Sequence, residues 1–283
     1  MSFISRGILL VHMDIKSTSI IGVLVLGTLA AGGVLWYLNE HPTPIIPDHT
    51  GVATTTAPRE LAAPQKIEEH ADYYDVTGTI PSDTPLKDTA GDAASQAAVD
   101  AMEQYVLTSI QSFKEQGNFD HLSPEDIKMF GFDQGRKEAF TVSYTSTEGP
   151  HSISYLFTFY EDTLGAHPNT TYHTFTFDRK TGNLLALKDL FTPGTNYLSV
   201  LSKISRATLP SQLAKAANER TGDLDMAYLT RGTTPVAGNF ENWYISGSTV
   251  VLTFPPYQVQ AYVFGAPELS IPFSTLPIKD EYK

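Results

Sequence analysis

Two histidines, His167 and His173, come nearest in type and spacing to metal chemistry. An imidazole nitrogen is a common zinc ligand, but a site needs further donors at suitable spacing. No nearby carboxylate has a recognisable ligand spacing, and His173 shares a strand face with Phe175 and Phe177. We therefore expect packed or hydrogen-bonded histidines, with no metal site and no other cofactor.

Two aspartates, Asp178 and Asp189, are candidates for a general acid and base. Asp178 opens a turn that ends in Thr181-Gly182, and Asp189 lies inside the segment 187–191, so turn and cap roles are better supported for both. The sequence has no G-x-S-x-G or H-E-x-x-H motif, no Gly-rich phosphate loop and no cysteine. We expect no catalytic residues and no enzymatic activity.

A short loop at 165–169 is the clearest candidate for binding. Glycine and proline fix its backbone, either to receive a partner or to join two strands, and the sequence leaves both readings open. A later segment, 257–262, offers two tyrosines. The predicted partner-binding residues are Gly165, Ala166, His167, Pro168, Asn169, Tyr257 and Tyr262.

The strands around this loop are marked by a period of two. Apolar residues alternate with polar ones in three consecutive stretches, which predicts three successive antiparallel strands. One face of them carries Phe140, Val142 and Tyr144, then Ile153, Tyr155, Phe157 and Phe159, then His173, Phe175 and Phe177. After the turn at Asp178, residues 184–187 predict a fourth strand that folds back on the third.

Helices are expected before and after these strands in the chain. A first strand at 73–80 precedes a helix that begins at Asp92 and ends at Gly117-Asn118, in which apolar residues recur at spacings of three and four. Residues 195–219 have helical spacing, with a second short helix after Pro210. The last predicted strands cover 240–246, 249–254 and 269–273.

This order of elements predicts an α+β fold, in which an antiparallel β-sheet packs with helices and one transmembrane helix precedes it. No internal repeat is present. The predicted regions are a cytoplasmic segment (1–18), a transmembrane helix (19–38), a Pro/Thr-rich spacer (39–67), a strand-plus-helix region (68–135) and a C-terminal α+β region (136–283).

The segment 19–38 carries no charge and is long enough to cross a bilayer as a helix. Arg6 and Lys16 precede it and Glu40 follows it, which places the C-terminal domain outside a cytoplasmic membrane in a single-pass topology. A cleaved signal peptide and a buried soluble helix remain alternatives, as does a translation start at Met13. The expected partner of this segment is the lipid bilayer.

The charge of the chain restricts its other partners. Beyond position 38 there are 17 basic and 30 acidic residues, a net charge of −13. Such a domain lacks the basic surface of nucleic-acid-binding proteins, so we expect no nucleic acid. It would attract a cationic partner, although solubility alone explains the charge equally well.

Several motifs occur in an order that carries a family resemblance. They are the loop at 165–169, the turn at 177–182, the segment 187–191 and the stretch VVLTFPPY at 250–257. In this order they resemble the RsiV-like extracytoplasmic domain family, which also supplies the N-terminal, non-catalytic region of the peptidoglycan deacetylase PdaC. A glycine that is usual in the family's loop is Leu164 here.

The resemblance, which covers about residues 68–278, implies a membrane-anchored extracytoplasmic binding or sensing module. It implies a protein or cell-wall ligand outside the membrane, with a lysozyme-like protein as one candidate. The alternative is a non-catalytic accessory domain for a cell-wall deacetylase or hydrolase. The chain carries no deacetylase domain after the resembling region, and residues 1–18 are short for sequestering a sigma factor.

Overall fold

The computed structural model describes residues 61–217 and 221–283. The predicted cytoplasmic segment, the transmembrane helix and the first part of the spacer (1–60) lie outside the described residues. Within the described ranges, no helix combines the length and the apolar character that crossing a membrane requires.

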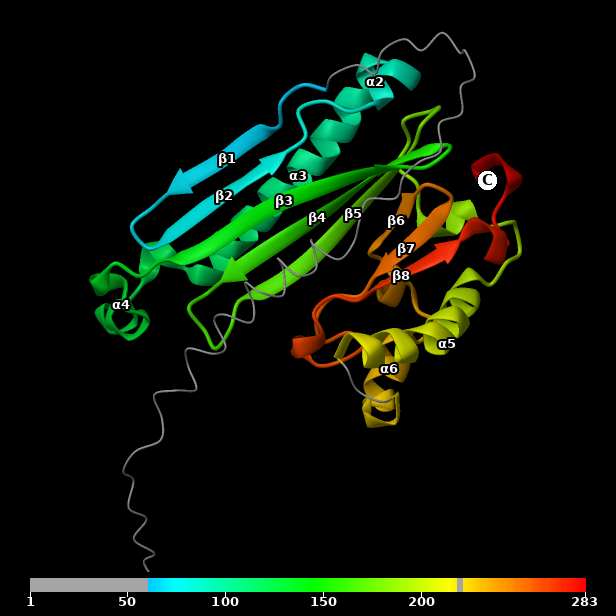
Figure 1. Ribbon diagram of the computed structural model, residues 1–283. Helices are drawn as coiled ribbons and strands as arrows, with labels where there is room; N and C mark the ends of the chain where they lie inside the picture. The colour runs from blue at the N-terminus through cyan, green and yellow to red at the C-terminus, as the bar shows by residue number, and fades with distance from the viewer. Residues whose placement is uncertain (1–60, 218–220) are drawn as a thin grey trace, which may run out of the picture. The chain divides into compact units, whose positions relative to one another are not determined.

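Five strands form the larger of two sheets, in the order β1-β2-β3-β4-β5 (Figure 1). Their bounds are Gln65–His70, Tyr74–Ile80, Glu138–Glu148, Ser152–Asp162 and Asn169–Asp178. Neighbouring strands are antiparallel except β2 and β3, which are parallel. The predicted β3, β4 and β5 are therefore confirmed, and the parallel pair was not anticipated.

The parallel pair follows from α3, the long helix Asp92–Gly117, which carries the chain from β2 back to the start of β3. A parallel connection requires such a crossover, whereas antiparallel strands need only a turn. The helix ends at Asn118, whose φ of 48° is left-handed. Its predicted apolar stripe packs on the aromatic face of the sheet, and the buried residues of this core are Val76, Ile80, Leu86, Ala98, Met102, Val106, Ile110, Phe113, Phe140, Val142, Ile153, Tyr155, Phe157, Phe159, Phe175 and Phe177.

Two short helices flank the ends of α3. They are α2 (Leu86–Thr89) and α4 (Pro124–Phe130). The second begins with a capping box, because the Ser123 hydroxyl accepts a hydrogen bond from the Asp126 amide while the Asp126 carboxylate accepts one from the Ser123 amide.

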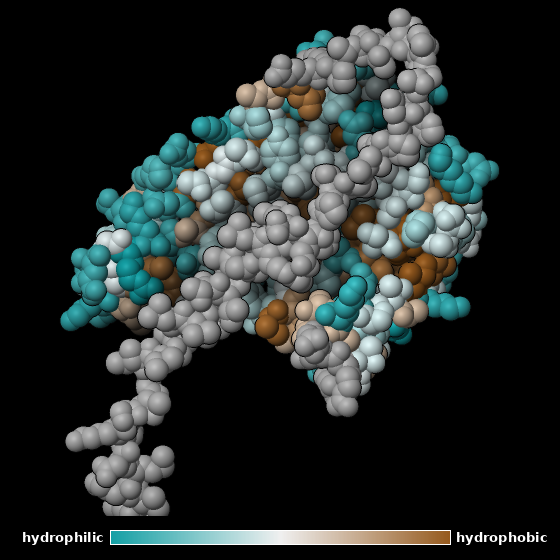
Figure 2. Space-filling model, in the orientation of Figure 1, coloured by the Kyte–Doolittle hydropathy of each residue, from teal (hydrophilic) through white to brown (hydrophobic). Residues whose placement is uncertain are grey.

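The opposite face of the five-stranded sheet is rich in serine and threonine, and its visible part is mostly pale in Figure 2, as expected for residues of intermediate hydropathy. Hydroxyls on this face bind the backbone of β6 (Trp243–Ser246). The Ile245 amide donates to the Ser154 hydroxyl at 3.0 Å, and the Trp243 amide donates to that of Thr174 at 3.1 Å. The Thr147 hydroxyl donates to the Ile245 carbonyl at 2.6 Å. Side chains thus occupy the edge of β6 where another strand would bind.

The second sheet has three antiparallel strands in the order β6-β7-β8, with β7 at Thr249–Thr253 and β8 at Glu268–Pro272. Helices α5 (Tyr197–Ala217) and α6 (Met226–Gly232) accompany it. Its separate core contains Leu190, Leu201, Leu209, Leu213, Leu229, Phe240, Trp243, Ile245, Val250, Leu252, Phe254, Leu269, Ile271 and Phe273 among its buried residues. The α+β class and the mainly antiparallel pairing are confirmed, but the described residues form two sheets instead of one.

Two expectations about local structure were wrong. Strand β1 begins at Gln65, inside the range expected to be spacer, because its edge pairs with β2. Residues 184–187 form a single bridge, between Phe177 and Leu184, and no strand. The chain instead turns into a 3₁₀ helix at Leu187–Leu190, whose spacing of three buries both terminal leucines in the second core.

A third correction concerns Pro210, which does not divide the helix at 195–219. Helix α5 passes through it without a second helix. Proline removes one backbone donor and usually kinks or ends a helix. Here Leu209 and Leu213 are buried on either side of it, with exposed fractions of 0% and 2%, and packing holds the helix together.

Candidate functional site

The predicted binding loop and the predicted tyrosine segment meet in the structure, although they are about ninety positions apart. His167 Nε2 and the Tyr257 hydroxyl are hydrogen-bonded at 3.0 Å. The His167 ring stacks on that of Tyr262, with centroids 4.3 Å apart and planes 27° apart. The Tyr262 hydroxyl donates to the Pro168 carbonyl at 3.0 Å. We call His167, Tyr257 and Tyr262 the tyrosine surface.

The hydrogen bonds identify the tautomer of a neutral His167. Its Nδ1 lies 2.9 Å from the Pro168 carbonyl oxygen, which only accepts, so Nδ1 carries the proton and donates. Nε2 of the neutral ring then accepts from the Tyr257 hydroxyl. Both ring nitrogens are therefore engaged, and the histidine orients Tyr257.

Left-handed backbone at two non-glycine residues shapes this surface. Leu164 has φ 59°, and its amide donates to the Asp162 carboxylate at 2.9 Å. Tyr257 has φ 68° and keeps 46% of its surface exposed. Such backbone is costly for a bulky residue, so its surroundings must hold it. The Gln258 side chain does so next to Tyr257, by donating to the carbonyls of Gly232 and Asn239, each at 2.9 Å.

The other predicted site residues lie close by in the chain. Gly165 and Ala166 are exposed in the same loop, and Asn169 is the exposed first residue of β5, opposite Glu161 in the sheet register. Pro168 and Tyr262 are half-buried. The structure thus places the seven predicted residues in one loop and one facing segment. Their role in binding stays a prediction.

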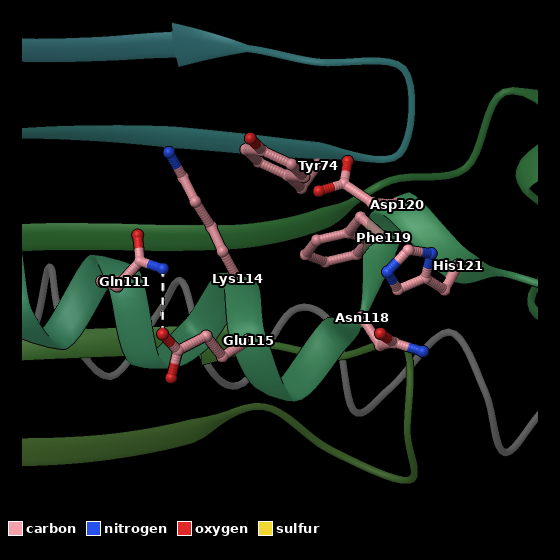
Figure 3. A pocket seen from close by; sticks show the side chains of 8 residues that line it. All are labelled: Tyr74, Gln111, Lys114, Glu115, Asn118, Phe119, Asp120 and His121. Carbon is pink, nitrogen blue, oxygen red and sulfur yellow. Dashed lines mark hydrogen bonds between the residues drawn. The ribbon is translucent and has the colours of Figure 1, made fainter.

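A hollow of about 350 Å³ lies at the C-terminal end of α3, beside Tyr74 of β2 (Figure 3). Lys114 lines this hollow, and its ammonium group already has two partners. It donates a hydrogen bond to the Glu69 carboxylate at 2.6 Å and lies 5.5 Å from the centre of the Tyr74 ring. The hydrogen bonds from Lys114 and Tyr74 lower the pKa of Glu69. The cluster of Glu69, Tyr74 and Lys114 links β1, β2 and α3.

His173 packs as expected. Its ring stacks on Tyr105 of α3, and burial lowers its pKa to about 4. Among the described residues, no group of histidine and carboxylate side chains could hold a metal ion. Likewise, in residues 61–217 and 221–283 no serine or threonine hydroxyl is hydrogen-bonded to a histidine ring, the pairing that activates a nucleophile.

Sequence reasoning missed one chemically distinctive place, the carboxylates Glu138 and Glu161. Glu138 is buried, with 7% of its surface exposed, and burial with the nearby Glu161 and Asp162 raises its pKa to about 7. Burial also raises the pKa of Glu161. The alternation of apolar and polar residues in this strand did contain a sign of this pair. Glu161 continues the apolar face of Phe157 and Phe159, where a charged residue is unexpected.

One protein family matches the part of the chain that runs from the 3₁₀ helix before α5 to the end of the second sheet. Residues 188–274 match a family described as protein of unknown function (DUF3298). This supports a DUF3298 assignment for that part of the chain, and RsiV-like membership in particular stays a prediction.

Two curated bacterial proteins match part of the chain. The peptidoglycan-N-acetylmuramic acid deacetylase PdaC of Bacillus subtilis (strain 168) is 30% identical over 133 residues, which cover 46% of this chain and 27% of PdaC. The esterase Rv3036c of Mycobacterium tuberculosis H37Rv is 26% identical over 143 residues, which cover 50% of this chain and 58% of the esterase. The chain therefore spans less than two thirds of either relative.

A solved structure shares the fold. The crystal structure of a DUF3298 family protein from Pseudomonas aeruginosa PAO1 aligns with a TM-score of 0.51 and 15% identity, over 79% of this chain and 97% of that one. The shared α+β fold extends beyond the matched segment 188–274.

The two aspartates first considered for acid–base chemistry stabilise turns, as expected. An Asp178 carboxylate oxygen accepts hydrogen bonds from the amides of Lys180 and Thr181, at 3.0 and 2.7 Å. The Asp189 carboxylate accepts from the Ala186 amide at 2.9 Å. Both groups are satisfied by local backbone.

Proposed function

We propose that this chain is a cell-envelope binding or sensing module that recognises its ligand through the tyrosine surface and performs no catalysis itself. The observation that carries the proposal is the hydrogen-bonded and stacked set of His167, Tyr257 and Tyr262, built from two distant segments. Binding residues commonly lie on loops held by a rigid scaffold, and here a β-sheet and a helix-anchored segment supply it.

The chemistry of the tyrosine surface favours a cationic protein ligand. Aromatic rings with polar ends are common at the energetic centres of protein interfaces, and their faces attract ammonium and guanidinium groups. The whole chain carries a net charge of −12, which speeds the approach of a cationic partner. A lysozyme-like protein satisfies both conditions, and a cell-wall ligand is the second possibility.

The proposed location is the outer side of a cytoplasmic membrane. Residues 19–38 would anchor the chain as a single helix, with the spacer after it holding the C-terminal domain off the bilayer. The partial match to PdaC, a peptidoglycan deacetylase, is consistent with a cell-wall setting.

The test is binding of the full chain to lysozyme, measured by biolayer interferometry at about 0.1 M and about 1 M salt. Screening shortens the range of charge attraction from about 10 Å to about 3 Å between these conditions. A shaped interface keeps a measurable affinity at the higher salt, whereas attraction by net charge alone is lost there.

Variants assign the binding to the tyrosine surface. Tyr257→Gly preserves the left-handed backbone while it removes the ring, and we expect at least about a tenfold loss of affinity, or about 1.4 kcal/mol. Tyr73→Ala, which removes a half-buried tyrosine beside Phe132, is the control and should bind as the parent does. Equal binding by all three proteins would reject the tyrosine surface as the site.

The alternative function is a non-catalytic accessory domain for a cell-wall deacetylase or hydrolase, which the partial match to PdaC favours. Sedimentation of the chain with purified peptidoglycan, compared between the parent and Tyr257→Gly, separates this role from protein recognition. Turnover of acetylated peptidoglycan or of a chromogenic ester by the purified chain would contradict both roles.

A further inference from the structure

A groove of about 310 Å³ lies between α3 and the sheet, near one end of β3, β4 and β5. Its apolar part is formed by Phe113, Phe140 and Phe159, and its polar part includes Glu161, Gln116 and Thr171. None of these residues belongs to the tyrosine surface, so the groove is a separate place.

The Glu161 carboxylate is the charged group of this groove. Glu161 pairs with Phe140 in the register of β3 and β4, and it follows Phe159 on the same strand face. It is half-buried, and no hydrogen bond or ion pair joins its side chain to any residue in the described part of the chain. Within residues 61–217 and 221–283, this half-buried carboxylate beside phenyl rings therefore has no cationic partner.

A second carboxylate, that of Glu138, adds further unpaired negative charge near Glu161. Glu138 lies on the same face of β3 as Phe140, is 7% exposed, and likewise has no side-chain partner among the described residues. Its neighbour in the chain, Lys137, is 3.1 Å from Asp75 and so is already paired. Burying carboxylates without a cation costs free energy, and repulsion between them adds to the cost.

We propose that this groove binds a primary ammonium group carried on a short aliphatic stem. The ammonium would neutralise Glu161 and reduce the repulsion on Glu138, and the stem would lie along Phe113, Phe140 and Phe159. Long basic side chains bury their methylene stems on apolar surface in this way, and aromatic faces also attract an ammonium group. Gln116 and Thr171 supply acceptors for its remaining hydrogens.

Two sources carry this chemistry, a lysine side chain in a peptide and a free alkylamine. The test is ligand-observed saturation-transfer NMR on the full chain with n-pentylamine, n-pentanol and Nα-acetyl-lysine N-methylamide as probes. We expect a saturation-transfer signal from at least one of the two amines. The alcohol, which has the same stem without the charge, should bind at least about tenfold more weakly. Stronger binding of the lysine derivative than of pentylamine assigns the site to a peptide, and the reverse assigns it to a free amine.

Variants decide whether binding occurs in this groove. Glu161→Gln is nearly isosteric and should weaken the binding of the preferred amine at least about tenfold, whereas Glu115→Gln, an exposed carboxylate of α3 outside the groove, should not change it. Gln116→Lys places an ammonium at the rim from an exposed helix position and should block the amine, which provides a test that does not depend on folding of the Glu161 variant.

Equal binding of the amine and the alcohol would overturn the proposal. So would amine binding that neither Glu161→Gln nor Gln116→Lys reduces. Because the tyrosine surface shares no residue with the groove, loss of lysozyme binding in Tyr257→Gly leaves this result unaffected.

Discussion

Tyr105 of α3 and His173 of β5 stack face to face, with ring centroids 3.7 Å apart and planes 12° apart. This contact closes the side of the first core, because both rings also pack on Phe175. It places an ionisable ring in a site that favours its neutral form.

The stacked histidine makes the fold sensitive to acid. Burial lowers the pKa of His173 to about 4, below the value of about 6.5 in an unfolded chain. The unfolded state therefore binds a proton first, and stability falls as the pH drops from 6.5 through 4. Allowing for its partial exposure, we expect a loss on the order of 1 to 2 kcal/mol. His173→Phe should remove this part of the loss while it keeps the stack.

Urea unfolding of the parent and of His173→Phe at pH 7.5 and 4.5 checks the prediction. His121→Gln, which changes an exposed histidine, is the control. If the variant lost as much stability as the parent at pH 4.5, His173 would not be the acid-sensitive group.

Glu138 should produce the opposite pH dependence. Burial, with the nearby Glu161 and Asp162, raises its pKa to about 7, so the protonated form is favoured by folding. Its contribution to stability is present at low pH and is lost as the pH rises through 7. Glu138→Gln should therefore raise the free energy of unfolding at pH 8.5 by about 1 to 3 kcal/mol and change it little near pH 5.

Denaturant unfolding at the two pH values measures this effect, with Glu115→Gln as the exposed control. Destabilisation of Glu138→Gln at both pH values would mean that the carboxylate is required structurally, contrary to the prediction.

Ser154 should couple the two sheets. Its hydroxyl accepts from the Ile245 amide at 3.0 Å and is hydrogen-bonded to the Thr176 hydroxyl at 2.9 Å. Ser154→Ala leaves a buried amide without an acceptor, which costs about 1 to 3 kcal/mol. Ser143→Ala, on the same face but exposed, should change the free energy of unfolding by less than about 0.5 kcal/mol.

Amide hydrogen exchange gives the sharper measurement for Ser154. The Ile245 amide should exchange faster in Ser154→Ala than in the parent and in Ser143→Ala, because its acceptor is gone. Unchanged protection at Ile245 would show that the hydroxyl does not hold this strand.

A pair of glycines tests the anchoring of the tyrosine surface. A Cβ at Gly232 would overlap the Gln258 carbonyl oxygen, whereas one at Gly238 would meet nothing within 4 Å. Gly232→Ala should destabilise the protein by about 2 kcal/mol and, because Gln258 follows Tyr257, weaken ligand binding. Gly238→Ala should leave both within experimental error.

Thermal unfolding and the lysozyme-binding measurement together check this pair. A stable Gly232→Ala protein that binds as well as the parent would show that the contact with Gln258 is dispensable.

The elements that depend on local pattern were predictable from the sequence. The apolar stripe of α3 and the alternation in β3, β4 and β5 each report which face is buried, and the structure follows them. The contact of the binding loop with Tyr257 and Tyr262 was not predicted, since it joins segments that nothing local connects.

The missed features depend on long-range contacts. The split into two sheets arises because Ser154 and Thr174 offer hydroxyls to β6 in place of a strand, and alternation alone does not reveal that choice. Pro210 stays helical because tertiary packing outweighs its local preference. Glu161 was readable as a charge on an apolar face, but its groove depends on where α3 lies.

The hydroxyls along β6 also limit how the chain can be divided. A fragment confined to residues 188–274 would lack β3, β4 and β5 and so would present the bare donors and acceptors of β6 to solvent. An unpaired strand edge is a template for intermolecular pairing. Such a fragment would also lose Leu276, Ile278 and Tyr282 from its core. The polar face of the large sheet therefore covers the edge of β6 that would otherwise be open to pairing with another chain.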